Sequence, residues 1–180
     1  MKQIFAAIDA VTTRLDRHAD WLLPTLARAT FAAVLLGYFW TSALTKFDGS
    51  PFSLSAGAYS QIFPKAFEAA GYDTSAFGPF ANLIALAGAW AEVLLPLLLV
   101  LGLFTRPAAL AMIGFVVVQS LTDVFGHMAD AATVGAWFDR ASDSLILDQR
   151  ALWGLLLAVL VLKGAGPISL DRMVRQWVSG

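Results

Sequence analysis

The sequence predicts an all-α membrane protein. The predicted fold is a bundle of four transmembrane helices with amphipathic surface helices at the N- and C-termini and an aromatic-rich loop cap on the outer side. Of the 180 residues, 58% are hydrophobic and only 14% are charged, whereas a soluble domain carries about 25% charged residues. The apolar residues also gather into four runs within one integral membrane domain, residues 1–180. These predicted spans are about residues 22–45, 80–104, 107–125 and 145–163.

The chain begins with an amphipathic segment, Met1 to Asp20. Its apolar residues recur at spacings of four, three and four, which makes one stripe along a helix. The members of this stripe are Ile4, Ile8, Val11 and Leu15. We therefore expect a helix that lies on the membrane surface, separate from the first span.

Each of the first two spans carries one charged residue. Arg28 lies near the start of the first span, where its side chain can reach the interface. The second span is long enough to cross a bilayer with some tilt, and it carries Glu92 close to its midpoint. We expect Thr105 to Pro107 to form a tight turn into the third span.

The fourth span is short. Its uninterrupted apolar part, Ala151 to Leu162, does not cover a bilayer, so Asp148, Gln149 and Arg150 are expected within the outer part of the helix. After Pro167 the tail forms a second amphipathic surface helix with Trp177 on its apolar face.

Basic residues predict the orientation. With four spans both termini lie on one side, and that side carries most of the lysines and arginines: Lys2, Arg14, Arg17, Arg28, Arg106, Lys163, Arg172 and Arg175. The opposite side carries Lys46, Lys65, Arg140 and Arg150. The positive-inside rule therefore predicts cytoplasmic termini.

The first outer loop is rich in aromatic residues, which is not typical of a disordered linker. We expect it to fold back as a cap over the outer mouth of the bundle. A short helix is predicted over Ala56 to Ala70, with Gly71 ending it.

Glu92 is the most informative single residue, because an ionised carboxylate at mid-bilayer costs on the order of 3 kcal/mol. It must face the bundle interior or be protonated. Gly88, Ala85 and Ala89 flank the same sector, so a close helix approach there is expected. A neutral glutamate hydrogen-bonded between helices and a proton-handling or ligand-binding glutamate both fit the pattern.

The third span carries a polar face near its outer end. Gln119, Asp123 and His127 recur every four residues and are expected to stack on one side of the helix. An aspartate and a histidine at this spacing can share a metal ion, although an interfacial hydrogen-bond cluster fits them better.

Polar groups of all four spans thus converge on the outer half of the bundle. We interpret this as a hydrated pocket that opens outward and is floored by Glu92. Its tryptophans would supply flat walls for a planar ligand such as a quinone, although simple helix packing explains them better. The predicted pocket residues are Arg28, Trp40, Lys46, Trp90, Gln119, Asp148, Arg150 and Trp153.

Several function classes are excluded by residue types. Cysteine is absent, so this chain has no disulfide, thiolate metal site or dithiol redox chemistry. The net charge of -1 and the lack of a basic block exclude nucleic acid as a partner. No nucleophilic triad, P-loop or dinucleotide fingerprint is present.

Three segments resemble a known family. Arg28 leads an apolar run to Lys46, Glu92 is followed by LLPLLLVLGLFTRPAAL, and the chain closes with KGAGPISLDR, Lys163 to Arg172. On these segments the chain is similar to DoxX-like family membrane proteins. The resemblance implies a four-helix protein of the bacterial plasma (inner) membrane, and in some members a subunit of a quinone-linked oxidoreductase or a link to oxidative or metal stress through partner proteins.

These features support more than one function. The leading hypothesis is a membrane subunit of a redox system whose outer pocket holds a quinone and whose Glu92 handles a proton. A component that handles or transports a metal ion or small molecule is an alternative, as is a non-enzymatic anchor for a soluble partner. Small residues in the second span leave a homo-oligomer open.

Overall fold

The computed structural model describes residues 1–180 apart from the side chain of Ala7. All of its regular elements are helical, and one isolated antiparallel bridge joins Phe47 and Leu54. The α-helices are α1 (Lys2–Phe31), α2 (Gly37–Leu44), α3 (Ala56–Ile62), α4 (Pro64–Ala69), α5 (Pro79–Leu101), α6 (Thr105–Leu121), α7 (Ala131–Val134), α8 (Leu147–Lys163) and α9 (Leu170–Ser179). Three shorter elements join them, the π-helical turns η1 (Ala32–Leu36) and η3 (Thr122–Gly126) and the 3₁₀ turn η2 (Thr74–Ala76).

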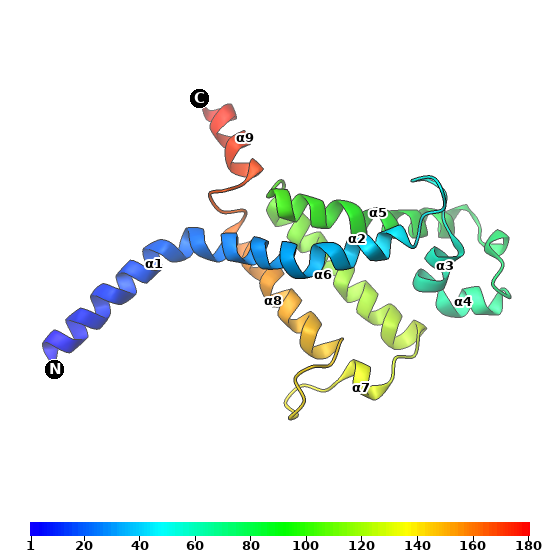
Figure 1. The fold of residues 1–180 in the computed structure, drawn as a ribbon, viewed down its shortest axis with the longest axis horizontal. Coiled ribbons are helices and arrows are strands. Elements are labelled where there is room, and N and C mark those ends of the chain that lie inside the picture. The colour runs from blue at the N-terminus through cyan, green and yellow to red at the C-terminus, as the bar shows by residue number, and fades with distance from the viewer.

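The long helices close into one bundle. α6 packs between α5 and α8, α1 packs against α8, and α2 packs against α5 (Figure 1). The core between them is apolar, because each helix contributes large side chains that are buried. Its largest members are Phe31, Phe39, Leu99, Met112, Leu157 and Leu160.

The outside of this bundle is also apolar. Large hydrophobic side chains such as Val34, Leu83, Val117 and Leu155 are exposed on all the long helices. A soluble protein rarely exposes so much apolar surface, whereas lipid covers it without cost. Three helices are long and apolar enough to cross a membrane, namely Lys2–Leu44, Pro79–Leu101 and Thr105–Gly126. The molecule is therefore an integral membrane protein, while α8 has only 17 residues and is shorter than these three.

The first helix differs from the prediction. It runs through α1, η1 and α2 as one helix of 43 residues, and no helix end separates Asp20 from Leu22 in the described chain. At about 1.5 Å per residue it is roughly twice as long as the hydrocarbon core is thick. Its N-terminal half projects from the bundle (Figure 1). The change from an amphipathic to an apolar pattern marks a change of surroundings and not a break in the helix.

The turn between α5 and α6 also lies elsewhere than predicted. The chain reverses at Gly102–Phe104, where Gly102 has φ +66° and Phe104 has φ +49°. Thr105 to Pro107, which the sequence predicted as the turn, form the first turn of α6. A proline is tolerated there because the first helical N–H groups have no partner within the helix.

The loop between α2 and α5, residues 45–78, which we call the cap after the predicted orientation, contains α3 and α4. The predicted helix over residues 56–70 is divided into α3 and α4 at Phe63, because Pro64 begins a new helix there. Tyr59 and Phe67 are buried, and their rings lie 4.9 Å and 6.1 Å from that of Phe77. The Tyr59 hydroxyl donates to the Asn82 side chain at 2.9 Å, which ties the cap to α5.

At the opposite end of the bundle, which we call the inner end after the predicted orientation, the Arg28 guanidinium donates hydrogen bonds to backbone carbonyls. It donates to Leu99 O at 3.0 Å and Val100 O at 2.5 Å at the end of α5. It also donates to Ala165 O at 2.9 Å and to Ile168 O in the α8–α9 loop. One cation therefore binds carbonyls at the C-terminal end of α5 and in the α8–α9 loop and holds three segments together.

Asp171 completes the inner end. Its carboxylate accepts from the backbone N–H groups of Phe104 at 2.8 Å and Thr105 at 2.9 Å, at the start of α6. Burial alone would raise the pKa of Asp171, but the hydrogen bonds from Thr105 and Phe104 together outweigh it and hold this pKa below its usual range. The carboxylate thus caps the positive end of α6.

Replacing Gly102 with alanine should destabilise the protein. An added Cβ would lie 2.7 Å from both Arg28 Cζ and Ser169 Cβ, and a left-handed alanine costs a further ~1–2 kcal/mol. We expect a lower melting temperature in detergent. Gly37→Ala is the matched control, because its Cβ has nothing within 4 Å. Alanine should stabilise the helix there by ~0.5–1 kcal/mol. Equal melting temperatures for the two variants would contradict this packing.

The lowered pKa of Asp171 predicts acid sensitivity. A carboxylate whose pKa is depressed by folding stabilises the native state above its unfolded pKa, about 3.9, and loses that contribution as the pH falls through its lower folded value. Melting temperatures between pH 6 and pH 3 should therefore fall less steeply for Asp171→Asn than for the wild type. The variant should already be less stable at neutral pH, because one helix N–H loses its acceptor. Parallel curves would show that this cap carries no pH dependence.

Candidate functional site

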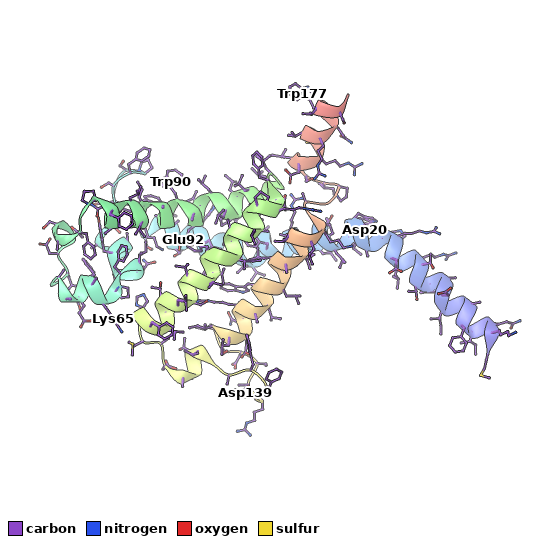
Figure 2. All side chains as sticks on the ribbon, turned by 180° about the vertical axis from the view of Figure 1, so that it is seen from behind. Asp20, Lys65, Trp90, Glu92, Asp139 and Trp177 are labelled. Carbon is purple, nitrogen blue, oxygen red and sulfur yellow. The ribbon has the colours of Figure 1, made fainter. Side chains whose placement is uncertain are left out.

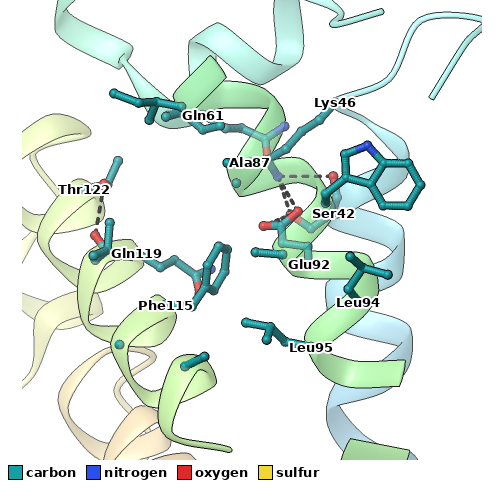
Figure 3. A pocket seen from close by; sticks show the side chains of 18 of the residues that line it. Ser42, Lys46, Gln61, Ala87, Glu92, Leu94, Leu95, Phe115, Gln119 and Thr122 are labelled. Atoms are coloured by element: carbon teal, nitrogen blue, oxygen red, sulfur yellow. Dashed lines mark hydrogen bonds and ion pairs between the residues drawn. The ribbon is translucent and has the colours of Figure 1, made fainter. Parts of the chain in front are cut away.

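A buried ion pair lies at the outer end of the bundle. Lys46 follows α2 and Glu92 lies in the middle of α5, and their Nζ and Oε2 atoms are 2.8 Å apart (Figure 3). Each residue is only 3% exposed. A carboxylate in an apolar environment is stable only with a partner, and Lys46 supplies one with the opposite charge.

Neighbouring polar groups complete the hydrogen bonding of Lys46 and Glu92. Lys46 Nζ donates to Ser42 Oγ at 2.8 Å and to Gln61 Oε1 at 2.7 Å. Ser42 Oγ in turn donates to Glu92 Oε1 at 3.1 Å. Ser42 and Lys46 are four residues apart and share a side of α2, while Gln61 comes from α3 in the cap. The cluster therefore joins the cap, α2 and α5 at one point.

A cavity of about 860 Å³ lies beside this cluster, between α5 and α6. It exists because the two helices present glycines and alanines to each other there. These small residues are Ala87, Gly88 and Ala91 of α5 and Ala111 and Gly114 of α6. Exposed Ile84, Leu94 and Val118 border the cavity, so we infer that it opens between the two helices toward lipid.

The cavity is polar at one end and apolar at the other. Toward the outer side it is lined by Ser42, Lys46, Gln61, Glu92, Gln119, Asp123 and His127. Toward the inner side it is lined by Leu95, Leu98 and Phe115, among other apolar groups (Figure 3). The arrangement suits an amphipathic molecule with a polar head and an apolar body.

The predicted polar face of α6 lines this cavity. Gln119 Nε2 donates to the Tyr38 hydroxyl at 2.8 Å, while Gln119 Oε1 is buried and has no hydrogen-bond partner among the described residues. Asp123 pairs with Arg150 at 2.5 Å, and His127 Nε2 lies 3.3 Å from the Gln61 carbonyl oxygen. The buried oxygen of Gln119 is an acceptor without a donor, which is uncommon in a folded protein.

These contacts bear on the metal hypothesis for Asp123 and His127. The described residues contain no group of three or more histidine, aspartate or glutamate side chains placed to hold a metal ion. Asp123 Oδ2 is already bound to Arg150. A third protein ligand is therefore not brought to this pair.

The structure brings Lys46, Trp90 and Gln119 to the cavity with Glu92, but it places the other predicted pocket residues elsewhere. Arg28 lies at the inner end, and Trp40 donates to the Val93 carbonyl at 3.2 Å. Asp148 accepts from the Ser144 N–H at 3.0 Å, so it ties the start of α8 to the preceding loop.

Arg150 and Trp153 lie on the other side of α6. The Arg150 guanidinium binds Asp123 and Ser120 and stands 6.0 Å from the Trp153 ring. Trp153 packs against Tyr38 and Phe39, with ring centroids 5.4 Å and 6.1 Å away. Arg150 therefore ties α8 to α6 and η3, whereas Trp153 packs α8 against α2.

Several cavity residues were not predicted from the sequence, and Tyr38, Ser42 and Gln61 are polar examples. The sequence does give a reason to expect Ser42, because a serine one helical turn before Lys46 lies on the same side of the helix and can contact the same groups as the lysine. It gives none for Gln61, since this residue reaches the pair only through the fold of the cap. Tyr38 lies in an apolar run that gives no reason to single it out.

A comparison with protein families places these residues in context. The family model described as DoxX matches residues 23–127, which is more than half of the chain. The chain belongs to the DoxX family. The matched residues include every residue that lines the cavity of this DoxX protein, from Tyr38 to His127. Its segment Lys163 to Arg172 lies beyond the match, as do α8 and α9. No curated protein and no solved structure matches the chain.

Removing one partner of the buried pair should destabilise the protein more than removing both partners. Glu92→Gln or Lys46→Met alone leaves an unpaired buried group and should destabilise the protein by about 3–5 kcal/mol. The double variant should recover much of that loss, which chemical denaturation in detergent would measure as a double-mutant cycle.

The exposed pair between Lys163 and Asp20 is the matched control for this cycle. It has the same 2.8 Å separation, but Lys163→Gln should cost no more than about 1 kcal/mol. Additive losses in the Lys46 and Glu92 variants would show that the two side chains do not act as a pair.

Proposed function

We propose that this DoxX protein is a membrane subunit of a quinone-linked redox system, and that the cavity between α5 and α6 binds a quinone or a similar amphipathic small molecule. The observation that carries the proposal is the polarity of the cavity. A buried Lys46–Glu92 cluster stands at its outer end, and apolar side chains line its inner end. Its position between two lipid-facing helices would let an apolar ligand enter from the bilayer.

The cavity fits such a ligand in size and chemistry. Its volume of about 860 Å³ lies within the roughly 300–1,000 Å³ that small-molecule sites occupy. A ligand carbonyl in the polar end would accept from Lys46 Nζ in exchange for one of its present acceptors. The buried Gln119 Oε1 needs a donor, and the hydroxyl of a quinol would supply one. Phe115 and Trp90 provide flat surfaces.

The ion pair gives the site a way to hold a proton. A bound quinone supplies two-electron, two-proton redox chemistry. Glu92 would take up or release a proton beside the ligand, while Lys46 and Ser42 hold its carboxylate in place. The electrons would come from a redox partner protein. Thiol redox chemistry of this chain is excluded, because it lacks cysteine.

The proposal includes the topology. We place four spans in a bacterial inner membrane with both termini in the cytoplasm. The packing of α8 between α1 and α6, with Leu152 and Leu155 exposed, supports a fourth crossing. The excess of basic residues at the end that carries Arg28 and Arg106 supports the orientation.

A second candidate function is a non-enzymatic membrane anchor for a soluble partner. The projecting half of α1 favours it, because its apolar stripe is exposed along its length. The stripe consists of Ile4, Ile8, Val11 and Leu15. In that case the cavity would be dispensable and deletion of the projecting half would abolish partner binding.

Quinone binding can be tested with two matched variants. Gly114 and Gly37 both lie in helices with nothing within 4 Å of an added Cβ, but only Gly114 lines the cavity. In detergent, titration with decylubiquinone and with a short-chain menaquinone should quench tryptophan fluorescence saturably. Gly114→Leu should weaken the affinity by about tenfold or more because the new side chain fills the cavity.

Gly37→Leu should leave the affinity unchanged. Organic extraction of the protein purified from membranes should release a quinone from the wild type and less of it from Gly114→Leu. If neither quinone binds saturably, or if both leucine variants bind as the wild type does, the cavity is not a quinone site.

A further inference from the structure

A second cavity lies at the inner end of the bundle. It has a volume of about 440 Å³ and lies between the middle of α1, the end of α8 and the polar side of α9. Its walls include Asp20, Trp21, Lys163 and residues Ala165 to Pro167 of the loop. α9 contributes Arg172, Arg175, Gln176 and Ser179. We propose that this cavity binds the phosphate headgroup of an anionic phospholipid.

The charge of the cavity favours an anion. It contains three cationic side chains and a single carboxylate. Lys163 and Asp20 pair with each other at 2.8 Å, so their charges cancel. The two arginines of α9 then give the cavity a net positive charge that no residue of its wall neutralises.

The two arginine side chains keep donors available. The Arg172 guanidinium makes no hydrogen bond or ion pair with any residue that the structure describes. Arg175 uses only its Nε, which donates to the Asp171 carbonyl at 3.3 Å. A guanidinium presents its N–H groups as a fork that matches two oxygens of one phosphate. Arg172 and Arg175 are three residues apart and thus near one another on α9.

The surroundings favour a lipid over free phosphate. Exposed Leu22 and Leu26 continue from Trp21 along α1, and exposed Leu162 precedes Lys163 on α8. Acyl chains could follow these leucines from a headgroup held in the cavity. Figure 2 shows Asp20 and Trp177 on the side of the bundle away from Lys65, and Trp177 is 86% exposed.

α9 itself has the composition of an interfacial helix. Its exposed apolar side chains are Met173, Val174, Trp177 and Val178, and they recur at helical spacing. Its basic residues lie between them. A helix of this kind binds anionic membranes through both faces, and the basic cavity extends that binding to one specific headgroup.

The test is lipid binding by the full-length protein in detergent, measured by native mass spectrometry. Phosphatidylglycerol and phosphatidylcholine with identical acyl chains are the probes. Phosphatidylglycerol should bind at least about fivefold more tightly, since each basic residue near an anionic headgroup contributes about a factor of five. Arg172→Gln/Arg175→Gln should lose this preference, and Arg172→Lys/Arg175→Lys should keep most of it.

The matched control removes two charges from the other end of the molecule. Lys65→Gln/Arg140→Gln, at exposed positions of the outer loops, should bind both lipids as the wild type does. Equal binding of the two lipids by the wild type would overturn the proposal, and this comparison decides even if the glutamine variant does not fold. Equal losses in the two glutamine variants would also overturn it. Displacement of phosphatidylglycerol by excess inorganic phosphate would show a site for free phosphate instead.

Discussion

The ion pair between Lys46 and Glu92 is the constraint on which the outer half of this protein depends. Glu92 lies in the middle of a helix that is otherwise almost entirely apolar, and the bilayer offers no water to solvate it. Its partner comes from the end of α2, and Gln61 of the cap completes the contacts. The fold of an outer loop, the position of α2 and the depth of Glu92 are therefore coupled through one buried charge.

Buried or partly buried charged side chains are stabilised differently at the two ends of the bundle. At the inner end, Arg28 binds backbone carbonyls and Asp171 binds backbone N–H groups, so the charges neutralise helix termini and the segments there pack closely. At the outer end the charges pair with each other, and small residues of α5 and α6 leave space beside them. The larger of the two cavities therefore lies beside the outer ion pair. Its position next to a buried charge is the main reason to place the quinone site at the outer end.

The sequence predicted the features that follow from periodicity and from the cost of burying charge. The apolar helices, the helical segment within the aromatic loop and the polar face of Gln119, Asp123 and His127 all follow from local patterns. These local patterns did not identify which side chains contact one another. Lys46 was expected near Glu92 only as another outer polar group, and Gln61 not at all, because both contacts join segments far apart in the chain.

Two local predictions also failed for identifiable reasons. A proline marks a helix start or a turn, and at Pro107 the first turn of α6 accommodates it, so the reversal occurs at Gly102 instead. The boundary near Asp20 is a change in polarity within a continuous helix, which a hydropathy pattern cannot distinguish from a break. Arg28 was placed in the pocket because it is a charge in a span, although its partners are backbone carbonyls that carry no sequence signal.

The most direct test of this account is infrared difference spectroscopy of the wild type against Glu92→Gln, both in lipid bilayers. If Glu92 is ionised and paired with Lys46, the substitution removes a carboxylate stretching band, and Lys46→Met shifts or removes the same band. If the substitution instead removes the carbonyl band of a protonated carboxylic acid, and Lys46→Met leaves that band unchanged, the buried ion pair does not exist in the membrane.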